Sequence, residues 1–349
     1  MSTAKNPEVR TEATKVPTME VFRSEGKAPA LTIQKKVDTY NFPFTCNPMI
    51  GCLFNCRYCY LRSFPFNQSA TLGETMAYKA HFTKKLKAQL RKFRTLPLHL
   101  RRVQVGVASE VYHPRALKAL KEDTSLDMSD VGLMSNVLKA FLAEQEAGYL
   151  WAISIVTKSP LIVQDIDLLK QFQCLQAEIT ITTLDEDLKK VWEDRTPSVK
   201  RRLELIEELS NASIFTRVMA MPMFVRPEEE AGCETIEELE AKRWSIAEAI
   251  WKACEARGAK GIKSKPLHYF DTRQLLEGPA TRVKGKFSDP DKEFLIRSGE
   301  FVHDADGALV MVEMDSFYDK KTVKKHLPIK DYGYKTMPGL TDLDWGDVA

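Results

Sequence analysis

Three cysteines in the spacing C-x3-C-x2-C constrain this chain more than any other feature. Cys52, Cys56 and Cys59 lie in one short stretch that opens with an Asn-Pro pair and a glycine, residues typical of a loop. Three thiolates do not complete the four-coordinate shell of a structural zinc ion. They can bind three irons of a [4Fe-4S] cluster and leave the fourth iron open and reactive. The spacing therefore predicts an iron-sulfur site on a loop.

Two other uses of these cysteines are open. Zinc needs a fourth ligand, and Cys46 is the nearest candidate, but the resulting C-x5-C-x3-C-x2-C run matches no paired zinc spacing and no histidine lies nearby. Alternatively, the three thiols pack in a core, which is an odd use of three residues within eight positions of a turn-rich loop. The cluster is the favoured interpretation and zinc is the second.

Composition indicates a globular protein that works in a reducing compartment. The chain is 44% hydrophobic and 28% charged, and no apolar run approaches the length of a membrane span. Residues 1–15 lack the apolar stretch of a signal peptide, and the seven cysteines are an odd number, which favours reduced thiols over a disulfide framework. We expect a cytoplasmic location. The net charge of +3 is too small to name a partner.

Strand-like and helical patterns alternate along the chain. Runs typical of strands lie near residues 38–44, 103–108, 151–156, 177–182, 215–220 and 261–263. Apolar residues recur at helical spacing over 72–93, 133–141 and 203–209. This alternation predicts βαβ units, a parallel sheet and an α/β fold, in which sites lie at the carboxyl ends of the strands. The cysteines follow the first of these strands, so we expect them at that end.

The two ends of the chain have a different character. Residues 1–35 are polar and charged without periodicity, which predicts a flexible N-terminal arm. After residue 270 the alternating pattern weakens. A turn signal at Asp304-Ala-Asp-Gly307 predicts a hairpin over 300–317.

Four more segments follow the cysteines in a recognisable order. They are Val156-Thr-Lys-Ser-Pro160, Ile179-Thr-Ile-Thr-Thr183, Arg195-Thr-Pro-Ser198 with Arg201-Arg-Leu-Glu204, and Val218-Met-Ala-Met-Pro222. Together with the cysteines, this series resembles the radical S-adenosylmethionine (SAM) superfamily, in its spore photoproduct lyase-like (DNA repair photolyase-like) branch, over about residues 40–225.

The resemblance implies both a fold and a chemistry. The fold is a partial (β/α)6 TIM-like barrel, which we place at residues 36–270 as a radical SAM core, followed by a C-terminal extension at 271–349. In this family SAM is chelated by the open iron, and an electron from the cluster breaks the sulfonium bond to give a 5′-deoxyadenosyl radical. Such an enzyme needs a reductant, for which flavodoxin or ferredoxin is the expected class.

The resemblance also assigns SAM-binding roles to individual positions. Lys158 matches a lysine that pairs with the SAM carboxylate, although a strand-end lysine exposed to solvent is a common alternative. Ser109 and Glu110 match a serine and an acid at a strand end, and Glu110 can accept from the SAM ammonium or ribose. Thr180 matches a SAM-contacting serine and shares a strand face with Thr182, although both could simply pack. The backbone around Met221 would flank the adenine.

Candidate catalytic residues bring one departure from the family pattern. Tyr58 and Tyr60 flank Cys59 and could relay a hydrogen atom or shield the cluster. The lyases carry a hydrogen-donating cysteine shortly before the acid of this strand-end motif, where this chain has Val107 followed by Ala108. We therefore expect that the chain does not reverse the spore photoproduct. Arg195 could contact substrate or hold a loop.

A nucleic-acid partner has separate sequence support. Residues 77–109 contain no acid but nine lysines and arginines, namely Lys79, Lys84, Lys85, Lys87, Arg91, Lys92, Arg94, Arg101 and Arg102. A second basic run holds Lys320, Lys321, Lys324 and Lys325. Such stripes can bind the phosphates of DNA or RNA, but they are more often a solvated face.

The sequence thus predicts a radical SAM enzyme with a [4Fe-4S] cluster and SAM as cofactors, acting on DNA or RNA. Two alternatives remain. One is a radical SAM enzyme for a small molecule or peptide, and the other is a zinc- or cluster-bearing nucleic-acid-binding module.

Overall fold

The computed structural model describes most of the first three quarters of the chain and one later hairpin. The described residues are 18–22, 29–33, 42–59, 61, 72–96, 98–122, 127–129, 131–223, 225–226, 229, 232–266, 300–303 and 309–312. Tyr60 and the basic run at 320–325 lie outside them, so the predictions for these residues stay predictions.

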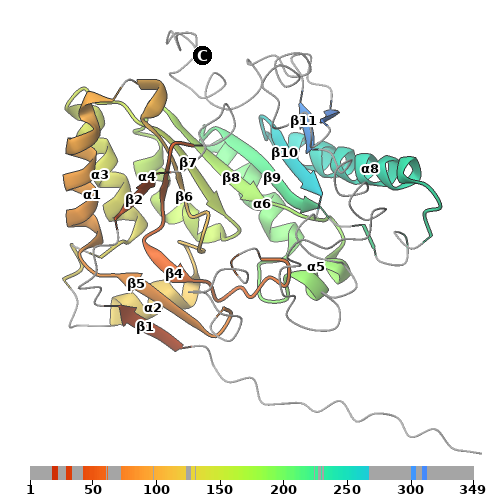
Figure 1. Cartoon of the computed structure of the whole chain (residues 1–349), viewed down its shortest axis with the longest axis horizontal. Coiled ribbons are helices and arrows are strands. Elements are labelled where there is room, and N and C mark those ends of the chain that lie inside the picture. Colours follow the sequence, from red (N-terminus) through yellow and green to blue (C-terminus); the bar gives the residue numbers. More distant parts are fainter. Residues whose placement is uncertain are drawn as a thin grey trace, which may run out of the picture.

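One large sheet organises the fold (Figure 1). Within the described residues its strands run in the order β2 (Leu31–Ile33), β3 (Phe44–Cys46), β6 (Arg102–Val105), β7 (Ala152–Thr157), β8 (Leu175–Thr180), β9 (Thr216–Met223), β10 (Ile262–Pro266), β11 (Glu300–His303) and β12 (Leu309–Val312). The strands from β3 to β10 are all parallel to their neighbours. The antiparallel β2 lies at one edge, and the antiparallel pair β11–β12 lies at the other.

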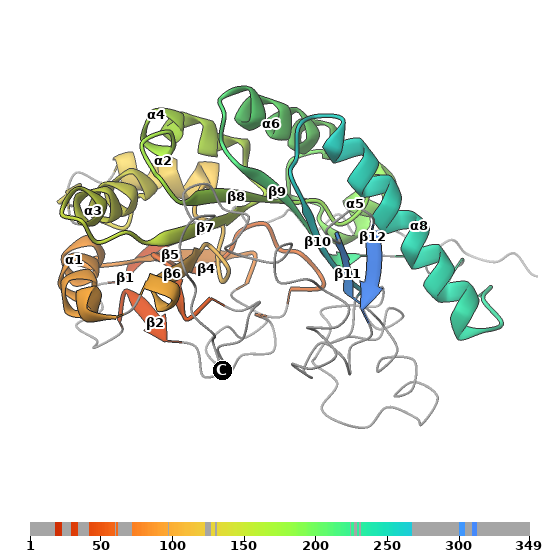
Figure 2. The ribbon, with the colours of Figure 1, turned by 90° about the horizontal axis from the view of Figure 1, so that it is seen from above.

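Helices pack against one face of this sheet. The described helices are α1 (Phe82–Lys92), α2 (Pro114–Glu122), α3 (Met134–Glu146), α4 (Ile166–Leu169), α5 (Glu186–Trp192), α6 (Val199–Asn211) and α8 (Ile236–Glu255), with short 3-10 turns η2 (Phe93–Thr95), η3 (Leu98–Leu100) and η4 (Pro160–Asp165). Of these, α1, α3, α4, α6 and α8 bury side chains in the main core with the sheet, while α2 and α5 pack mainly elsewhere. Figure 2 shows α1, α3, α6 and α8 arrayed along the convex side of the curved sheet. Six parallel strands with helices outside them make a partial (β/α)6 barrel of the α/β class.

A second, smaller sheet carries the cysteine-bearing segment. It consists of β1 (Thr18–Phe22), β5 (Thr75–Lys79) and β4 (Met49–Gly51), in that order. β4 pairs antiparallel with β5, and the three cysteines lie between these two strands. The pair therefore fixes both ends of the loop that contains them.

The two faces of the barrel sheet differ in polarity because side chains alternate along a strand. The convex face carries Val103, Ile155, Ile179 and Val218, which join the main core with α1, α3, α6 and α8. The concave face carries Gln104, Ser154, Gln176, Glu178 and Arg217, which lie in register across β6 to β9. Burying the apolar face under helices holds the fold together, and it leaves the polar face for the site.

Several strand limits differ from those expected from the sequence. The first barrel strand is β3 at 44–46, not 38–44, and residues 34–41 lie outside the described part. The next strand, β6, ends at Val105 and not at Ala108, because Gly106 has φ +83° and a Cβ there would lie 2.6 Å from the Val156 carbonyl oxygen. Thr182 similarly lies just beyond β8.

The expected helix over 72–93 is wrong in its first half. Met76 belongs to strand β5, and the helix begins only at Phe82. The hairpin strands near 300–317 are present as β11 and β12. Within the expected arm, β1 pairs with β5 and β2 with β3, so parts of residues 1–35 join the two sheets. The domain limits themselves stay predictions.

None of the described helices is long and apolar enough to cross a membrane.

Candidate functional site

The cysteine loop, residues 52–59, is a compact series of turns between β4 and β5. Gly51 (φ +76°) and Asn55 (φ +55°) adopt the left-handed conformation that such tight turns require. The Cys59 amide donates to the Cys56 carbonyl at 3.1 Å, and the Gly73 amide donates to the Cys52 carbonyl at 2.8 Å. Local hydrogen bonds therefore shape the loop from within and tie it to the start of β5.

The loop thiols lie in an apolar pocket. Cys56 is buried and Cys52 and Cys59 are partly buried, and they pack with Phe54, Leu188 and Trp192. Burial raises the pKa of Cys52 and of Cys56 to about 12, with Cys59 adding to the first shift and the Lys158 ammonium opposing the second. The Cys52 and Cys56 thiols are thus neutral until a metal replaces their protons.

This donor set fits a cluster better than a single ion. Among the described residues no group of three or more His, Cys, Asp or Glu side chains is arranged to hold one metal ion. In a [4Fe-4S] cube each thiolate binds a different iron, so the ligands lie farther apart than around one ion. Cys46, the candidate fourth zinc ligand, is fully buried in the main core and not in the pocket of the loop.

A buried carboxylate lies directly behind the loop. Glu193, at the end of α5, is fully buried, and its Oε2 lies 2.8 Å from Nη1 of Arg202 on α6. It also accepts hydrogen bonds from the Tyr58 hydroxyl and, at 3.2 Å, from the Thr182 hydroxyl. Burial alone would raise the pKa of Glu193, but the charges of Arg202 and Lys158 outweigh it and hold the pKa at about 2.

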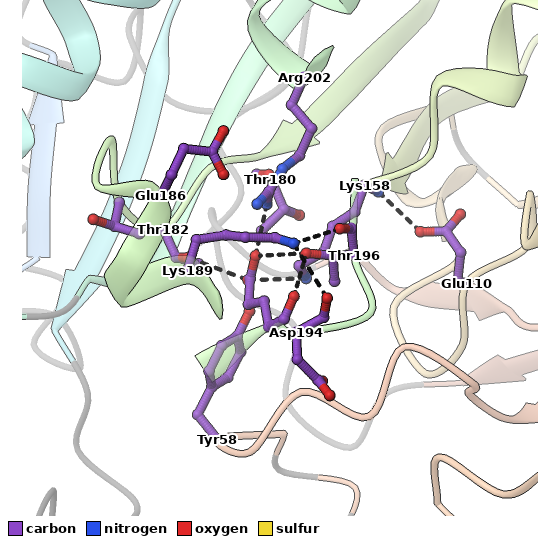
Figure 3. Close-up of polar contacts among 12 residues, drawn as sticks. Tyr58, Glu110, Lys158, Thr180, Thr182, Glu186, Lys189, Asp194, Thr196 and Arg202 are labelled. Carbon is purple, nitrogen blue, oxygen red and sulfur yellow. Dashed lines mark hydrogen bonds and ion pairs between the residues drawn. The ribbon is translucent and has the colours of Figure 1, made fainter. Parts of the chain in front are cut away.

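Tyr58 is therefore a donor with a fixed partner. Its side chain points from the cysteine loop into the same group of side chains as Lys158, Thr182 and Arg202 (Figure 3). Burial, together with Cys56 and Glu193, raises the pKa of Tyr58 well above its usual value. The phenol consequently keeps its proton, and its O–H group donates a hydrogen bond to the Glu193 carboxylate.

Lys158, at the end of β7, bridges this carboxylate and the loop. Its Nζ lies 3.9 Å from Glu193 Oε1 and 5.8 Å from the centre of the Tyr58 ring. Burial lowers the pKa of Lys158, but Cys56 and Glu193 outweigh it and the net pKa is raised. Its side chain is only 17% exposed, so Lys158 is not a solvent-exposed lysine, and a largely buried cation lies near the Cys56 thiol.

Glu110 is held in place by three donors from its own neighbourhood. Its Oε1 accepts from the Thr157 hydroxyl at 2.6 Å and the Tyr112 amide at 3.0 Å, and its Oε2 accepts from the Lys158 amide at 2.9 Å. Burial nevertheless raises the pKa of Glu110. A carboxylate can accept further hydrogen bonds beyond these three, so Glu110 retains acceptor capacity for a ligand.

The remaining predicted SAM contacts lie around the same end of the sheet. Ser109 is buried, and its hydroxyl has no hydrogen-bond partner among the described residues, which is unusual for a protein interior and leaves it available to a ligand. Thr180 and Thr182 are buried at the end of β8. Met221 is half-buried in β9, next to Pro222. The structure thus brings these residues to the strand ends near the loop.

Arg195 holds a loop. Its Nη1 donates to the Gly73 carbonyl at 2.5 Å, and Gly73 is the residue bonded to Cys52. Of the two roles open to Arg195 in the sequence, this contact favours the structural one.

On the concave face of the sheet, two residues before Thr180, lies a buried carboxylate that has no ion-pair partner among the described residues. Glu178 is 4% exposed, and its oxygens accept only from the amides of Gln176 at 2.5 Å and Gln104 at 3.3 Å. A buried acceptor of this kind suits a ligand with N–H donors, and it lies two residues before Thr180 on the same face of β8.

His113 supports the loop from the other side. Its ring lies 4.8 Å from that of Phe54 and is 5% exposed. Burial, and then the nearby Arg115, lowers the pKa of His113 to about 4, so the imidazole is neutral. Its Nδ1 has no hydrogen-bond partner.

The basic span is less available than its sequence suggests. Arg94 forms a two-point contact with Glu144 at 2.7 and 3.0 Å and stacks on Tyr149, and Arg102 is buried. The exposed cations of α1 are Lys84, Lys87, Arg91 and Lys92. Because α1 lies on the convex side (Figure 2), this basic face does not line the cysteine loop.

Glu193 and Arg202 are the central residues that sequence reasoning missed. Arg202 lies in the Arg201–Glu204 segment, and Glu193 lies two positions before Arg195 as the first of two consecutive acids, which was the only available signal. Nothing in the residue pattern shows that both side chains are fully buried.

Comparisons with known proteins place the chain. The family model described as the radical SAM superfamily matches residues 46–239. An uncharacterized protein of Methanocaldococcus jannaschii is 25% identical over 182 residues, which are 52% of this chain and 60% of that protein. The chain thus spans about three fifths of the length of the curated relative it matches.

Two solved structures are also similar. A spore photoproduct lyase complexed with dinucleoside spore photoproduct is 12% identical, with a TM-score of 0.48 over 88% of this chain and 77% of that one. The SuiB protein of Streptococcus suis bound to S-adenosylmethionine is 13% identical, with a TM-score of 0.42 over 72% and 42%. Because both TM-scores are below 0.5, family membership rests on the superfamily match.

His113 should make stability depend on pH. The unfolded chain takes up a proton on this residue below pH 6.5, whereas the folded protein does so only near pH 4. The free energy of unfolding should therefore fall as the pH drops through this interval, by about 3 kcal/mol in full. Urea denaturation at pH 7 and pH 4.5 should show a smaller loss for His113→Gln than for the parent protein. Equal losses would contradict a buried neutral imidazole.

Proposed function

Because the chain belongs to the radical SAM superfamily, whose model covers more than half of it, we propose that it is an enzyme that cleaves SAM reductively at a [4Fe-4S] cluster bound by Cys52, Cys56 and Cys59. The single observation that carries the proposal is the cysteine loop itself, where three thiols share one apolar pocket beside a buried cation. Members of this superfamily use a [4Fe-4S] cluster and SAM.

When bound, the cluster and SAM supply an electron and a 5′-deoxyadenosyl radical. This chain's own residues bind SAM and shield the thiols from water. Lys158 offers its ammonium to the SAM carboxylate, Ser109 offers its unpartnered hydroxyl, and Glu110, Thr180, Thr182 and the Met221 backbone complete the pocket. Phe54 and Trp192 exclude water from the thiols.

The cluster is tested by its metal content and by SAM turnover. Protein reconstituted without oxygen should bind about four irons and four sulfides. With dithionite it should convert SAM to methionine and 5′-deoxyadenosine. Replacing Cys52, Cys56 or Cys59 with Ala should abolish both. Cys46→Ala is the matched control, since this thiol is buried in the main core, and it should retain both. Stoichiometric zinc, or equal loss in the control, would contradict the assignment.

Lys158→Ala should weaken SAM binding. Removing the ammonium removes a charge-assisted contact, so the loss of binding free energy should be about 1.5–3 kcal/mol. Equilibrium dialysis of SAM with the reconstituted protein measures it. Lys190→Ala, which removes an exposed lysine paired with Asp187, should leave the affinity unchanged. Equal affinities of Lys158→Ala and the parent would show that Lys158 does not bind SAM.

We further propose that the substrate is DNA or RNA and that the spore photoproduct is not repaired. The first part is supported by the order of sequence segments and by the exposed cations of α1, and the second by Val107, which has no thiol. A small molecule or peptide is the alternative substrate, and a nucleic-acid-binding module without turnover is the alternative class. The reductant would be a flavodoxin or ferredoxin, and the location the cytoplasm, where thiols stay reduced.

Nucleic-acid binding should depend on the α1 cations. A fluorescent single-stranded oligonucleotide should lose affinity steeply between 50 and about 200 mM salt, and changing Lys84, Lys87, Arg91 and Lys92 together to Gln should flatten this dependence. Arg94→Gln is the control, because Arg94 is already paired with Glu144. No binding at low salt would favour a small molecule or peptide. Turnover of a spore-photoproduct dinucleotide would contradict the second part.

A further inference from the structure

Both ends of the cysteine loop are attached to one short segment that contributes none of the predicted SAM contacts. Trp192, Glu193 and Arg195, which we call the loop clamp, lie at and after the end of α5. The Trp192 carbonyl accepts from the Arg57 amide at 3.0 Å, and Glu193 accepts from the Tyr58 hydroxyl. Arg195 binds the Gly73 carbonyl, and Gly73 in turn binds Cys52.

The loop clamp is itself fixed from behind. Arg202 lies 2.8 Å from Glu193 Oε2 and also donates to the Thr180 carbonyl at 2.9 Å, so it joins α6 to the end of β8. Lys189 donates to the Thr196 carbonyl at 2.5 Å, and the Thr196 hydroxyl donates to the Glu193 carbonyl at 2.8 Å. Arg202 and Glu193 are each 0% exposed. The position of the carboxylate is thus set by the barrel and not by the loop.

We propose that Glu193 is a positioning residue for the iron-sulfur cluster. It acts through Tyr58: the carboxylate fixes the phenol, the phenol fixes the segment between Cys56 and Cys59, and the same carboxylate holds Lys158 at the thiols. Tyr58 is then an anchor of the loop and not a relay of hydrogen atoms. The proposal rests on the proposed function, because it concerns the cluster that the loop is proposed to hold.

Opposed charges explain why a carboxylate serves here. Glu193 faces Arg202 and Lys158, and it takes further hydrogen bonds from Tyr58, Thr182 and Thr196. A glutamine would keep an acceptor for Tyr58 but would leave two buried cations without a counter-charge. Glu193→Gln therefore tests the charge, and Tyr58→Phe tests the hydrogen bond between the phenol and the carboxylate.

The chain offers a matched control. Tyr112 donates from its hydroxyl to Asp165 at 2.9 Å, which is also a buried tyrosine–carboxylate pair, but this side chain packs in the main core and not in the pocket of the cysteine loop. Tyr112→Phe should lower the unfolding temperature as Tyr58→Phe does, because each loses a buried hydrogen bond. It should leave the cluster unchanged.

The decisive readouts are spectroscopic. In reconstituted protein, Tyr58→Phe and Glu193→Gln should each bleach in air about tenfold faster than the parent, equivalent to about 1.4 kcal/mol. The EPR spectrum of the reduced cluster, with and without SAM, should change in both variants. The double variant should be no worse than the more severe single variant, because the two residues share one contact.

Other outcomes would overturn the proposal. If Tyr58→Phe keeps the parent EPR spectrum and air stability but alters only the products formed from substrate, Tyr58 is a relay. If both variants lose only thermal stability, like Tyr112→Phe, the pair is merely structural.

A further measurement does not require a cluster. Amide hydrogen exchange of residues 52–59 in metal-free protein should be faster in Glu193→Gln than in the parent and the Tyr112→Phe control. If Glu193→Gln exchanges faster but the parent protein binds no iron, the loop clamp is supported and the proposed function is rejected. Unchanged exchange would reject the clamp.

Discussion

The buried ion pair between Glu193 and Arg202 is the contact on which the arrangement of the site depends. Two charges with no exposed surface are expensive to desolvate, and such pairs often add little net stability. Removing one partner, however, leaves an uncompensated buried charge, typically at a loss of about 3–5 kcal/mol. The pair is therefore better explained by the geometry it enforces. It joins β8, α5, α6 and the cysteine loop at one point.

This point exists because the barrel separates its two kinds of surface. On the convex face, valine and isoleucine side chains bury against helices and account for the cohesion of the fold. The concave face is thereby free to carry groups that a core would reject, including Glu178 and Arg217. The carboxyl ends of the parallel strands then collect loops that are far apart in sequence, which is how Tyr58 meets Glu193, 135 residues away.

The sequence predicted what is local and missed what depends on distant partners. The cysteine spacing, the βαβ alternation and the hairpin strands of β11 and β12 follow from short-range patterns. Met76 was placed in a helix because its spacing from Leu72 fits one, but pairing of β5 with β1 and β4 outweighed that spacing. The basic span predicted Arg94 as a phosphate ligand, but its guanidinium is already paired with the carboxylate of Glu144, 50 residues away. Glu193 carried no signal of burial, because its counter-charges come from other elements.

Burial has opposite effects on protons and on metal at the loop. The apolar pocket raises the pKa of Cys52 and Cys56 to about 12, since it penalises an isolated thiolate. An iron that replaces the proton neutralises that charge, and the same low-polarity surroundings then strengthen the metal–thiolate attraction and shield it from water. Cys46 has an equally raised pKa but lies in the main core, apart from the pocket of the cysteine loop, so burial alone does not make a ligand. Three thiols held at a fixed spacing do, and for that reason the contacts that hold the loop matter as much as the cysteines.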